Sequence, residues 1–177
     1  MVWNMTAALT GTPGVGKTTV GEFLRKEGYE VLDLNDFIDT KGLRGEIDQD
    51  RNTHEVDIES LKKEFSKSDG YDIVEGHLSH HLDLNPIIVL RCSPDVLYER
   101  MSSKDWKESK KKENIRAEIM DVILIESLEY SKEVYEIDTT DMEPKEVMGA
   151  IIEILSDDVE SYKAGQIDWS SEFLTEI

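Results

Sequence analysis

The sequence predicts an α/β fold in which helices flank a five-stranded parallel β-sheet. Apolar, strand-like segments alternate with amphipathic, helical segments between residues 5 and 155, which is typical of a doubly wound sheet. The uninterrupted apolar run at residues 87–90 (IIVL) indicates a strand that is buried on both faces. A glycine-rich turn at residues 11–18 separates the first strand from the first helix. Parallel α/β proteins that bind phosphate have this order of strand, turn and helix.

Five segments are predicted as strands because each is short, rich in apolar or β-branched residues and bounded by turn-forming residues. They cover residues 5–9, 30–34, 71–75, 87–90 and 134–137. Each is followed by a segment with helical periodicity or by the end of the regular pattern. The connections are long enough for the crossovers that parallel strands require.

Helices are predicted where apolar residues recur at spacings of three and four. Gly28 ends the first helix, and Pro94 and Pro144 occupy the first position of two later ones. One long amphipathic helix is expected to follow the basic segment and to extend to about residue 132. The buried faces are assigned to Val20, Phe23, Leu24, Ile58, Leu61, Phe65, Val96, Leu97, Ile115, Ile119, Val122, Ile123, Val147, Met148, Ile151 and Leu155.

The glycine-rich turn, GTPGVGKT at residues 11–18, matches the phosphate-loop motif G-x-x-x-x-G-K-[ST] in its expected context. Gly14 and Gly16 let successive backbone N–H groups converge on an anion at the positive end of a helix dipole. Lys17 supplies a mobile charge for the β- and γ-phosphates, and the Thr18 hydroxyl can ligate Mg²⁺. We therefore expect ATP and Mg²⁺ to bind here.

Two segments that follow the second and the fourth predicted strand predict a small phosphotransferase of the nucleoside-monophosphate-kinase type. No N-K-x-D motif for guanine recognition occurs in the chain, which disfavours a GTPase. The polar segment at about 35–57 is expected to be a loop or mobile cover that binds the acceptor, and the basic segment at about 103–113 a lid over ATP. We expect one P-loop kinase domain over residues 1–156 and an acidic C-terminal arm over residues 157–177.

The charge of the chain is strongly acidic but unevenly distributed. Its 20 Lys and Arg residues stand against 39 Asp and Glu residues, which gives a net charge of −19. This balance disfavours nonspecific electrostatic binding to a nucleic-acid backbone, although it allows a basic protein partner. The stretch from Arg100 to Arg116 is an exception, because basic residues outnumber acidic ones there. We expect phosphate to be bound near this stretch.

The remaining composition predicts a soluble cytoplasmic protein. Cys92 is the single cysteine, so no internal disulfide can form, and a reducing compartment is expected. The N-terminus resembles no signal peptide, and no apolar run approaches the length of a membrane span. We therefore expect neither secretion nor a membrane partner.

Six short motifs occur in a fixed order along the chain: GTPGVGKTT (11–19), VEGHLSH (74–80), IVLR (88–91), LYER (97–100), ENI (113–115) and IDW (167–169). Together they resemble the archaeal branch of the adenylate kinase isoenzyme 6 family. That family also includes a nuclear, coilin-interacting ATPase of animals and a yeast assembly factor of the small ribosomal subunit. The resemblance implies the reaction ATP + AMP ⇌ 2 ADP and ATPase activity. It also implies a role in small-subunit maturation through ribosomal protein uS11.

The resemblance assigns the ATP phosphates to Gly14, Gly16, Lys17, Thr18 and Thr19. An acidic-x-His motif at the end of the third strand also matches. By resemblance, Glu75 acts on Mg²⁺ through bound water, and His77 orients the attacking water or the acceptor. The residues alone leave two other interpretations open, in which Glu75 pairs with a lysine and His77 is a packing side chain. His77, His80 and His81 lack a nearby cysteine and fit no zinc pattern, so no metal cluster is expected there.

In the lid, Arg100 and Lys104 stand where family members have basic residues that contact phosphate or adenine. Lys104 replaces the usual arginine, so it keeps the charge but loses planar, bidentate contact. Arg116 is expected to face the phosphates and to clamp the transferred group. The other interpretation of the basic run is a solvated helix face.

The acceptor side departs from the family. Asp39 stands where human-type members carry an arginine, so Lys41 or Arg44 would have to supply the cation for the AMP phosphate. Three functions therefore remain open: an adenylate kinase, an ATP-dependent assembly factor with little kinase activity, and a kinase for another small acceptor, such as a different nucleoside monophosphate or a shikimate-like acid.

Overall fold

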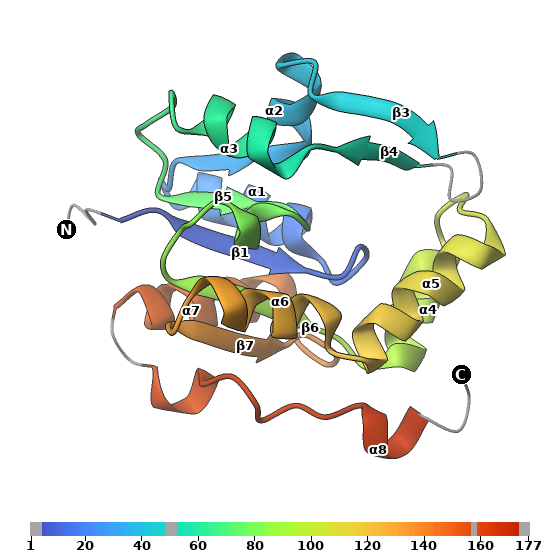
Figure 1. Cartoon of the computed structure of the whole chain (residues 1–177). Coiled ribbons are helices and arrows are strands. Elements are labelled where there is room, and N and C mark those ends of the chain that lie inside the picture. Colours follow the sequence, from blue (N-terminus) through green and yellow to red (C-terminus); the bar gives the residue numbers. More distant parts are fainter. Residues whose placement is uncertain (1–4, 49–52, 157–158, 174–177) are drawn as a thin grey trace.

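A computed structural model describes residues 5–48, 53–156 and 159–173 (Figure 1). Its main sheet has five parallel strands in the order β2-β5-β1-β6-β7, which confirms the predicted α/β fold. The strands are β1 (Ala7–Gly11), β2 (Val31–Asp33), β5 (Ile73–Glu75), β6 (Ile87–Arg91) and β7 (Val134–Asp138). Each begins and ends within a few residues of its prediction.

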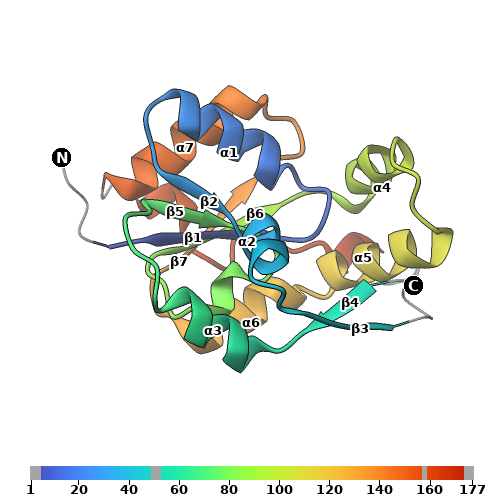
Figure 2. The same cartoon turned by 90° about the horizontal axis from the view of Figure 1, so that it is seen from above.

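Helices cover both faces of the sheet, as Figure 2 shows. Helices α1 (Lys17–Lys26) and α7 (Pro144–Leu155) lie on one face, and α3 (Ile58–Phe65) and α6 (Val122–Tyr130) lie on the other. Every residue of β1 and β6 is buried between the two layers. The predicted inward face of α7 is confirmed by Ile151, and that of α1 by Val20 and Leu24, which lie in one apolar cluster with the strands. Phe23, also assigned to the inward face of α1, is only half-buried and lies outside this cluster.

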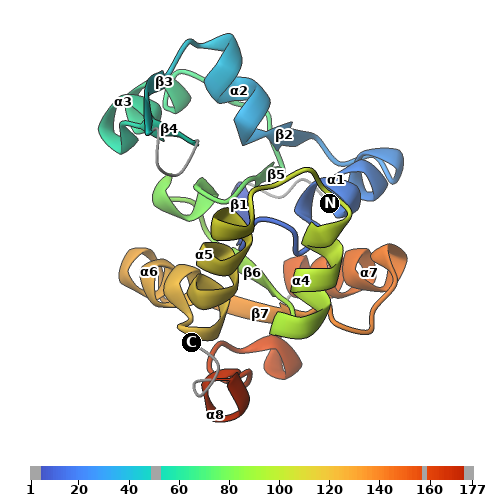
Figure 3. The same cartoon turned by 90° about the vertical axis from the view of Figure 1, so that its right-hand side faces the viewer.

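The carboxyl ends of all five strands meet at one edge of the sheet because the strands are parallel. Figure 3 looks onto this edge. The hairpin of β3 (Arg44–Asp48) and β4 (Thr53–Val56) lies with α2 (Leu34–Thr40) on one side of it, and α4 (Pro94–Ser102) and α5 (Glu108–Ile119) lie on the other. Ligands of open α/β sheets bind at such an edge. The architecture therefore places a candidate site between these two groups of elements.

The segment predicted as a loose cover at 35–57 contains regular structure instead. It forms α2 and an antiparallel hairpin of β3 (Arg44–Asp48) and β4 (Thr53–Val56). Phe37 and Ile38 on α2 are buried in a second apolar cluster, where the Phe37 ring contacts that of Phe65 edge-on. The prediction failed because polar residues dominate the segment, while only a few apolar side chains fix the helix.

The single long helix predicted up to residue 132 is two helices, α5 and α6. The chain turns between them at Asp121, whose φ of 53° lies in the left-handed region. Val122 was assigned to the inner face, but 37% of its surface is exposed. The turn brings the Asp121 carboxylate onto Arg91, so a distant ion pair overrides the local periodicity. Residues 108–113 of the predicted lid form the first turns of α5.

Arg91, the last residue of β6, is buried at the centre of a charged network. Its Nε lies 2.8 Å from Glu118 Oε1 of α5, and its Nη1 lies 2.6 Å from Glu136 Oε2 of β7. Nη2 contacts the Asp121 carboxylate. Glu118 and Glu136 are as buried as the arginine itself. Each charge depends on its partners, because an unpaired charge in a protein interior is strongly destabilising.

The C-terminal arm extends along the edge of β7 (Figure 1). Ala164 N donates to Val134 O at 3.3 Å, and the amides of Gly165 and Gln166 donate to Glu136. The arm includes a short 3-10 turn, Glu160–Tyr162, and α8, Ser170–Phe173. The remaining residues of the predicted arm, 157–158 and 174–177, lie outside the described residues. Among the helices that the structure describes, none is long and apolar enough to cross a membrane.

Candidate functional site

The phosphate loop connects β1 to α1 at the carboxyl edge of the sheet, as the motif predicts. Gly11 has a φ of 138°, and a Cβ there would collide with the Leu90 carbonyl oxygen of β6. Gly16 precedes α1 with a φ of 112°, again in the region that glycine favours. These two glycines let the loop turn tightly against the sheet. The N-terminus of α1 therefore points toward the open edge.

Lys17 is buried within the loop that it follows. Its Nζ donates to Gly11 O at 2.7 Å and to Thr12 O at 3.1 Å. Burial lowers the pKa of Lys17 to about 8, while the carboxylates of Glu75 and Glu118 oppose this shift. The ammonium form still predominates at neutral pH, so the side chain remains a cation beside the loop.

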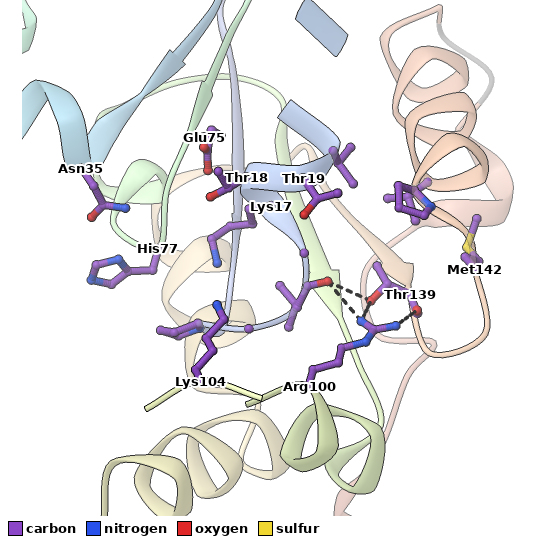
Figure 4. A pocket seen from close by; sticks show the side chains of 17 residues that line it. Lys17, Thr18, Thr19, Asn35, Glu75, His77, Arg100, Lys104, Thr139 and Met142 are labelled. Atoms are coloured by element: carbon purple, nitrogen blue, oxygen red, sulfur yellow. Dashed lines mark hydrogen bonds between the residues drawn. The ribbon is translucent and has the colours of Figure 1, made fainter. Parts of the chain in front are cut away.

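Glu75, at the end of β5, is fully buried. Neither of its carboxylate oxygens accepts a hydrogen bond from the described part of the chain. Burial, and after it the nearby Asp33, raises the pKa of Glu75 to about 7. Figure 4 shows its carboxylate close to Thr18 and above Lys17. An unsatisfied carboxylate beside a hydroxyl is a donor set that fits Mg²⁺, which prefers oxygen ligands and retains several waters.

His77 and Asn35 border the site on the side away from Thr139 and Met142, as Figure 4 shows. Burial, followed by the positive charge of Lys17, lowers the pKa of His77 to about 4. The imidazole is therefore neutral at neutral pH and can accept a hydrogen bond or a proton. Sequence analysis missed Asn35, which directly follows the residue that begins α2.

Arg100 of α4 lies on the opposite side of the site, where it connects the phosphate loop to the loop after β7. Its guanidinium donates to Val15 O at 3.3 Å, to Thr139 Oγ1 at 3.0 Å and to Thr139 O at 2.7 Å. These bonds appear as dashed lines in Figure 4. The guanidinium is thus fixed by protein oxygens and presents a rigid planar surface. Lys104 lies nearby, with its Nζ 4.9 Å from the centre of the Trp106 ring.

A cavity of about 510 Å³ extends over the phosphate loop and brings most of the predicted residues together. Gly14, Gly16, Lys17, Thr18, Thr19, Glu75, His77, Arg100 and Lys104 all line it. Its far end is formed by Thr139, Met142, Pro144 and Val147, which sequence analysis did not identify. These four follow the end of β7, so the rule that ligands bind at carboxyl ends of strands could have found them.

A second cavity, of about 600 Å³, lies beyond His77 and shares Pro13, Asn35 and His77 with the first. Ile38 and Val56 give it an apolar side, and Arg44 and Lys110 give it cations.

The sequence alone allows either Lys41 or Arg44 to supply the cation for an acceptor phosphate. Arg44 lines this second cavity, and Lys41 lies 5.6 Å from the Phe37 ring centre. The guanidinium of Arg44 is paired with the carboxylate of Asp39 through two hydrogen bonds, one of 2.8 Å.

Comparison with known proteins identifies the family. Residues 8–121 match a family model described as an AAA domain. The chain is 47% identical over 171 residues to an Archaeoglobus fulgidus protein named "Putative adenylate kinase", covering 95% of this chain and 93% of that one. A Methanocaldococcus jannaschii protein of the same name is 39% identical, with coverage of 96% and 95%. The chain belongs to this adenylate kinase-like family.

The fold of this adenylate kinase-like chain is also that of a solved P-loop kinase. Shikimate kinase from Bacteroides thetaiotaomicron superimposes with a TM-score of 0.54 and covers 86% of this chain and 98% of its own. The two sequences are only 17% identical, so the likeness concerns the fold alone. The P-loop fold predicted from the sequence is thereby confirmed.

Arg116 does not lie with the other predicted residues of this adenylate kinase-like chain. It lines a separate cavity of about 330 Å³ between α4, α5 and α8, together with Tyr98 and Phe173. The prediction that it faces the phosphates assumed one long helix. Because the chain turns at Asp121, α5 is a separate helix, and its Arg116 lines the cavity beside α4 and α8 and not the cavity over the phosphate loop.

Glu118, the second-last residue of the same helix, reaches the phosphate loop instead. Its Oε2 accepts a hydrogen bond of 2.5 Å from the Thr12 hydroxyl, while Oε1 accepts from Arg91 Nε and, at 3.2 Å, from Cys92 N. One buried carboxylate thus joins the phosphate loop, β6 and α5. No local pattern marked it, because a glutamate on a helix is usually exposed.

The raised pKa of Glu75 predicts how pH changes the stability of the ligand-free protein. Folding favours the protonated form, so the associated stability is complete below about pH 4.5 and is lost as the pH rises through about 7. Relative to Glu75→Gln, the free energy of unfolding of the wild type should fall by about 2 kcal/mol from about pH 5 to about pH 8. Urea unfolding at both pH values measures this. An exposed control, Glu99→Gln, should follow the wild type; an unchanged difference between wild type and Glu75→Gln would contradict the assignment.

Proposed function

We propose that the protein transfers the γ-phosphoryl group of ATP to AMP, ATP + AMP ⇌ 2 ADP, and hydrolyses ATP slowly when no acceptor is bound. The observation that carries this proposal is the pair of cavities that meet at the phosphate loop and share His77. A donor and an acceptor bound in the two would have their phosphates side by side. The names of the archaeal relatives support the nucleotide as acceptor.

The cavity over the phosphate loop would bind ATP. Backbone N–H groups of the loop and Lys17 would hold the phosphates at the N-terminus of α1. The nucleobase would lie at the far end, between the fixed guanidinium of Arg100 and the apolar side chains of Met142 and Pro144. An aromatic base stacks well on a guanidinium plane. Lys104 would add positive charge from the lid side.

Thr18 and Glu75 would hold Mg²⁺, the latter through a bound water. When bound there, Mg²⁺ would neutralise charge on the phosphate oxygens. The carboxylate would then be ionised, although burial favours its protonated form in the ligand-free protein. Lys17 lies close enough to influence the pKa of this carboxyl. The protein thus supplies charges of both signs at the site of transfer.

The second cavity would bind AMP, with its phosphate near Arg44. Asp39 holds this guanidinium through two hydrogen bonds, so an incoming phosphate would have to compete with the carboxylate for it. The apolar side formed by Ile38 and Val56 suits a nucleobase. Asp39 therefore weakens AMP binding without removing the cation that AMP requires.

In the reaction, an oxygen of the acceptor phosphate forms a bond to the γ-phosphorus, and the bond from the γ-phosphorus to the bridging oxygen of the leaving ADP breaks. This chain would contribute mainly positioning and charge. Lys17 would stabilise negative charge on the transferred group. His77, neutral and at the boundary between the cavities, would orient the attacking oxygen.

ADP formation from ATP should depend on AMP and on Lys17. Lys17→Ala should lower kcat at least about a hundredfold, because it removes the cation that contacts the transferred group. Coupled measurement of ADP with AMP, with other nucleoside monophosphates, with shikimate and without acceptor distinguishes the three functions. The exposed variant Lys145→Ala is the matched control. Full activity of a folded Lys17→Ala variant, or turnover that no acceptor increases, would contradict the kinase proposal.

We further propose that the protein acts in the cytoplasm in maturation of the small ribosomal subunit through uS11. The strongly acidic chain suits a basic protein partner better than direct binding of RNA. Val122, Ile125 and Leu128 support this role, because they form an exposed apolar face on α6. Acidic side chains at Glu126 and Glu129 lie on the same helix.

Purified uS11 should bind the protein in a salt-dependent manner, since opposite charges would attract the two proteins. Ile125→Asp should weaken this binding at least about tenfold by placing a charge in the apolar face. Calorimetric titration measures it, with Glu22→Ala on α1 as a control on the opposite side of the sheet. Absence of binding, or equal affinity for wild type and Ile125→Asp, would contradict the proposed contact.

A further inference from the structure

Two adjacent histidines and one glutamate meet beside the acceptor cavity. His80 and His81 belong to the short 3-10 turn Ser79–His81 that follows β5, and Glu126 belongs to α6. His80 Nε2 lies 3.0 Å from Glu126 Oε2. One ligand atom from each of the three side chains lies within 4.8 Å of the others. Sequence spacing could not reveal this group because Glu126 lies 46 residues after His80.

The ring of His80 is fixed in an orientation that suits a ligand. It is almost completely buried, and its Nδ1 lies 3.0 Å from the Thr10 hydroxyl. That hydroxyl can donate to the His77 carbonyl oxygen at 3.4 Å and accept from His80 Nδ1–H. In this tautomer the lone pair of Nε2 faces the Glu126 carboxylate, and a cation between them would be favourable. Metal-binding histidines commonly have such a partner on the other ring nitrogen.

The distance between these two donors agrees with coordination of a single ion. Two ligands about 2.0–2.1 Å from a tetrahedral Zn²⁺ are about 3.3 Å apart. The observed 3.0 Å between His80 Nε2 and Glu126 Oε2 needs only a small adjustment. The three ligand atoms lie within 4.8 Å of one another, so the His81 ring would have to move closer to the other two side chains to bind the same ion.

His81 has a buried ring nitrogen, Nδ1, whose hydrogen-bonding capacity is unsatisfied in the described part of the chain. An unsatisfied buried polar atom costs about 1–3 kcal/mol. A metal ion would satisfy it. Lys62, whose charge acts on this ring, has its Nζ 3.1 Å from Asp83 Oδ2 and 5.0 Å from the Tyr130 ring centre.

Both imidazoles are available as neutral ligands. Burial lowers the pKa of His80 to about 3, and burial followed by the charge of Lys62 lowers that of His81. Metal binding therefore requires no proton to leave either ring at neutral pH. Glu126 keeps 43% of its side chain exposed, so an ion can reach the group.

We propose that His80, His81 and Glu126 bind one divalent transition-metal ion of the Zn²⁺ class. Two imidazoles and one carboxylate suit Zn²⁺, Co²⁺ or Ni²⁺ and are a poor set for Mg²⁺, which prefers oxygen ligands. Because His80 and Glu126 also line the acceptor cavity, a fourth coordination position would open toward it. This site is separate from Thr18 and Glu75, and its existence does not depend on the kinase proposal.

Titration of the nucleotide-free protein with Co²⁺, followed by visible absorption, tests the site. We expect one ion per chain and displacement by Zn²⁺. Glu126→Gln keeps the size of the side chain and should weaken binding at least about tenfold, as should His81→Gln. Glu129→Gln, an exposed carboxylate on the same helix, should bind as the wild type does.

A thermal-unfolding scan with and without Zn²⁺ provides a second measurement, because an ion that binds only the folded protein raises its melting temperature. The increase should occur in the wild type and in Glu129→Gln but not in Glu126→Gln. Absence of Co²⁺ binding by the wild type, or equal affinity for wild type and Glu126→Gln, would overturn the proposal. The Glu126 variant remains informative if His81→Gln does not fold, since Glu126 lies partly at the surface.

Discussion

The buried guanidinium of Arg91 is the interaction on which much of the structure depends. It ties β6 to β7 through Glu136 and to α5 through Glu118, and it holds the turn between α5 and α6 through Asp121. Loss of one member of such a group costs about 3–5 kcal/mol, since the others would remain charged and buried. Glu118 extends the network to Thr12 of the phosphate loop, and Glu136 extends it to the C-terminal arm. The candidate nucleotide site thus rests on a charged core and not on apolar packing alone.

The residues proposed to act on the nucleotide lie together at the carboxyl edge of the parallel sheet. The glycine turn after β1 brings backbone N–H groups and Lys17 to the open end, and β5 brings Glu75 and His77 beside them. Two cavities share this boundary, one extending toward α7 and the other toward the hairpin. Their juxtaposition gives the proposed transfer its physical basis. Neither cavity alone would distinguish a kinase from a protein that only binds a nucleotide.

Local sequence patterns predicted the parts of the fold that depend on local physics. The phosphate loop, the buried strand β6 and the apolar face of α7 each follow from a few neighbouring residues. Interactions between distant residues escaped prediction. The turn at Asp121 depends on Arg91, and the environment of Arg116 changes with it. Glu126 joins His80 only in three dimensions. The ion pair between Arg44 and Asp39 escaped prediction for a different reason, because both residues lie in a segment that was expected to be a loop.

The two cavities that share His77 are proposed to bind a donor and an acceptor nucleotide with their phosphates adjacent. Equilibrium binding of diadenosine pentaphosphate, which links two adenosines through phosphates, tests this proposal most directly. We predict that one molecule binds per chain at least about tenfold more tightly than ADP, because two sites are occupied without a second loss of translational freedom. Arg44→Ala should weaken this binding, and Asp39→Asn should strengthen it by releasing the guanidinium. Binding no tighter than that of ADP, and insensitive to both variants, would contradict the proposed pair of adjacent nucleotide sites.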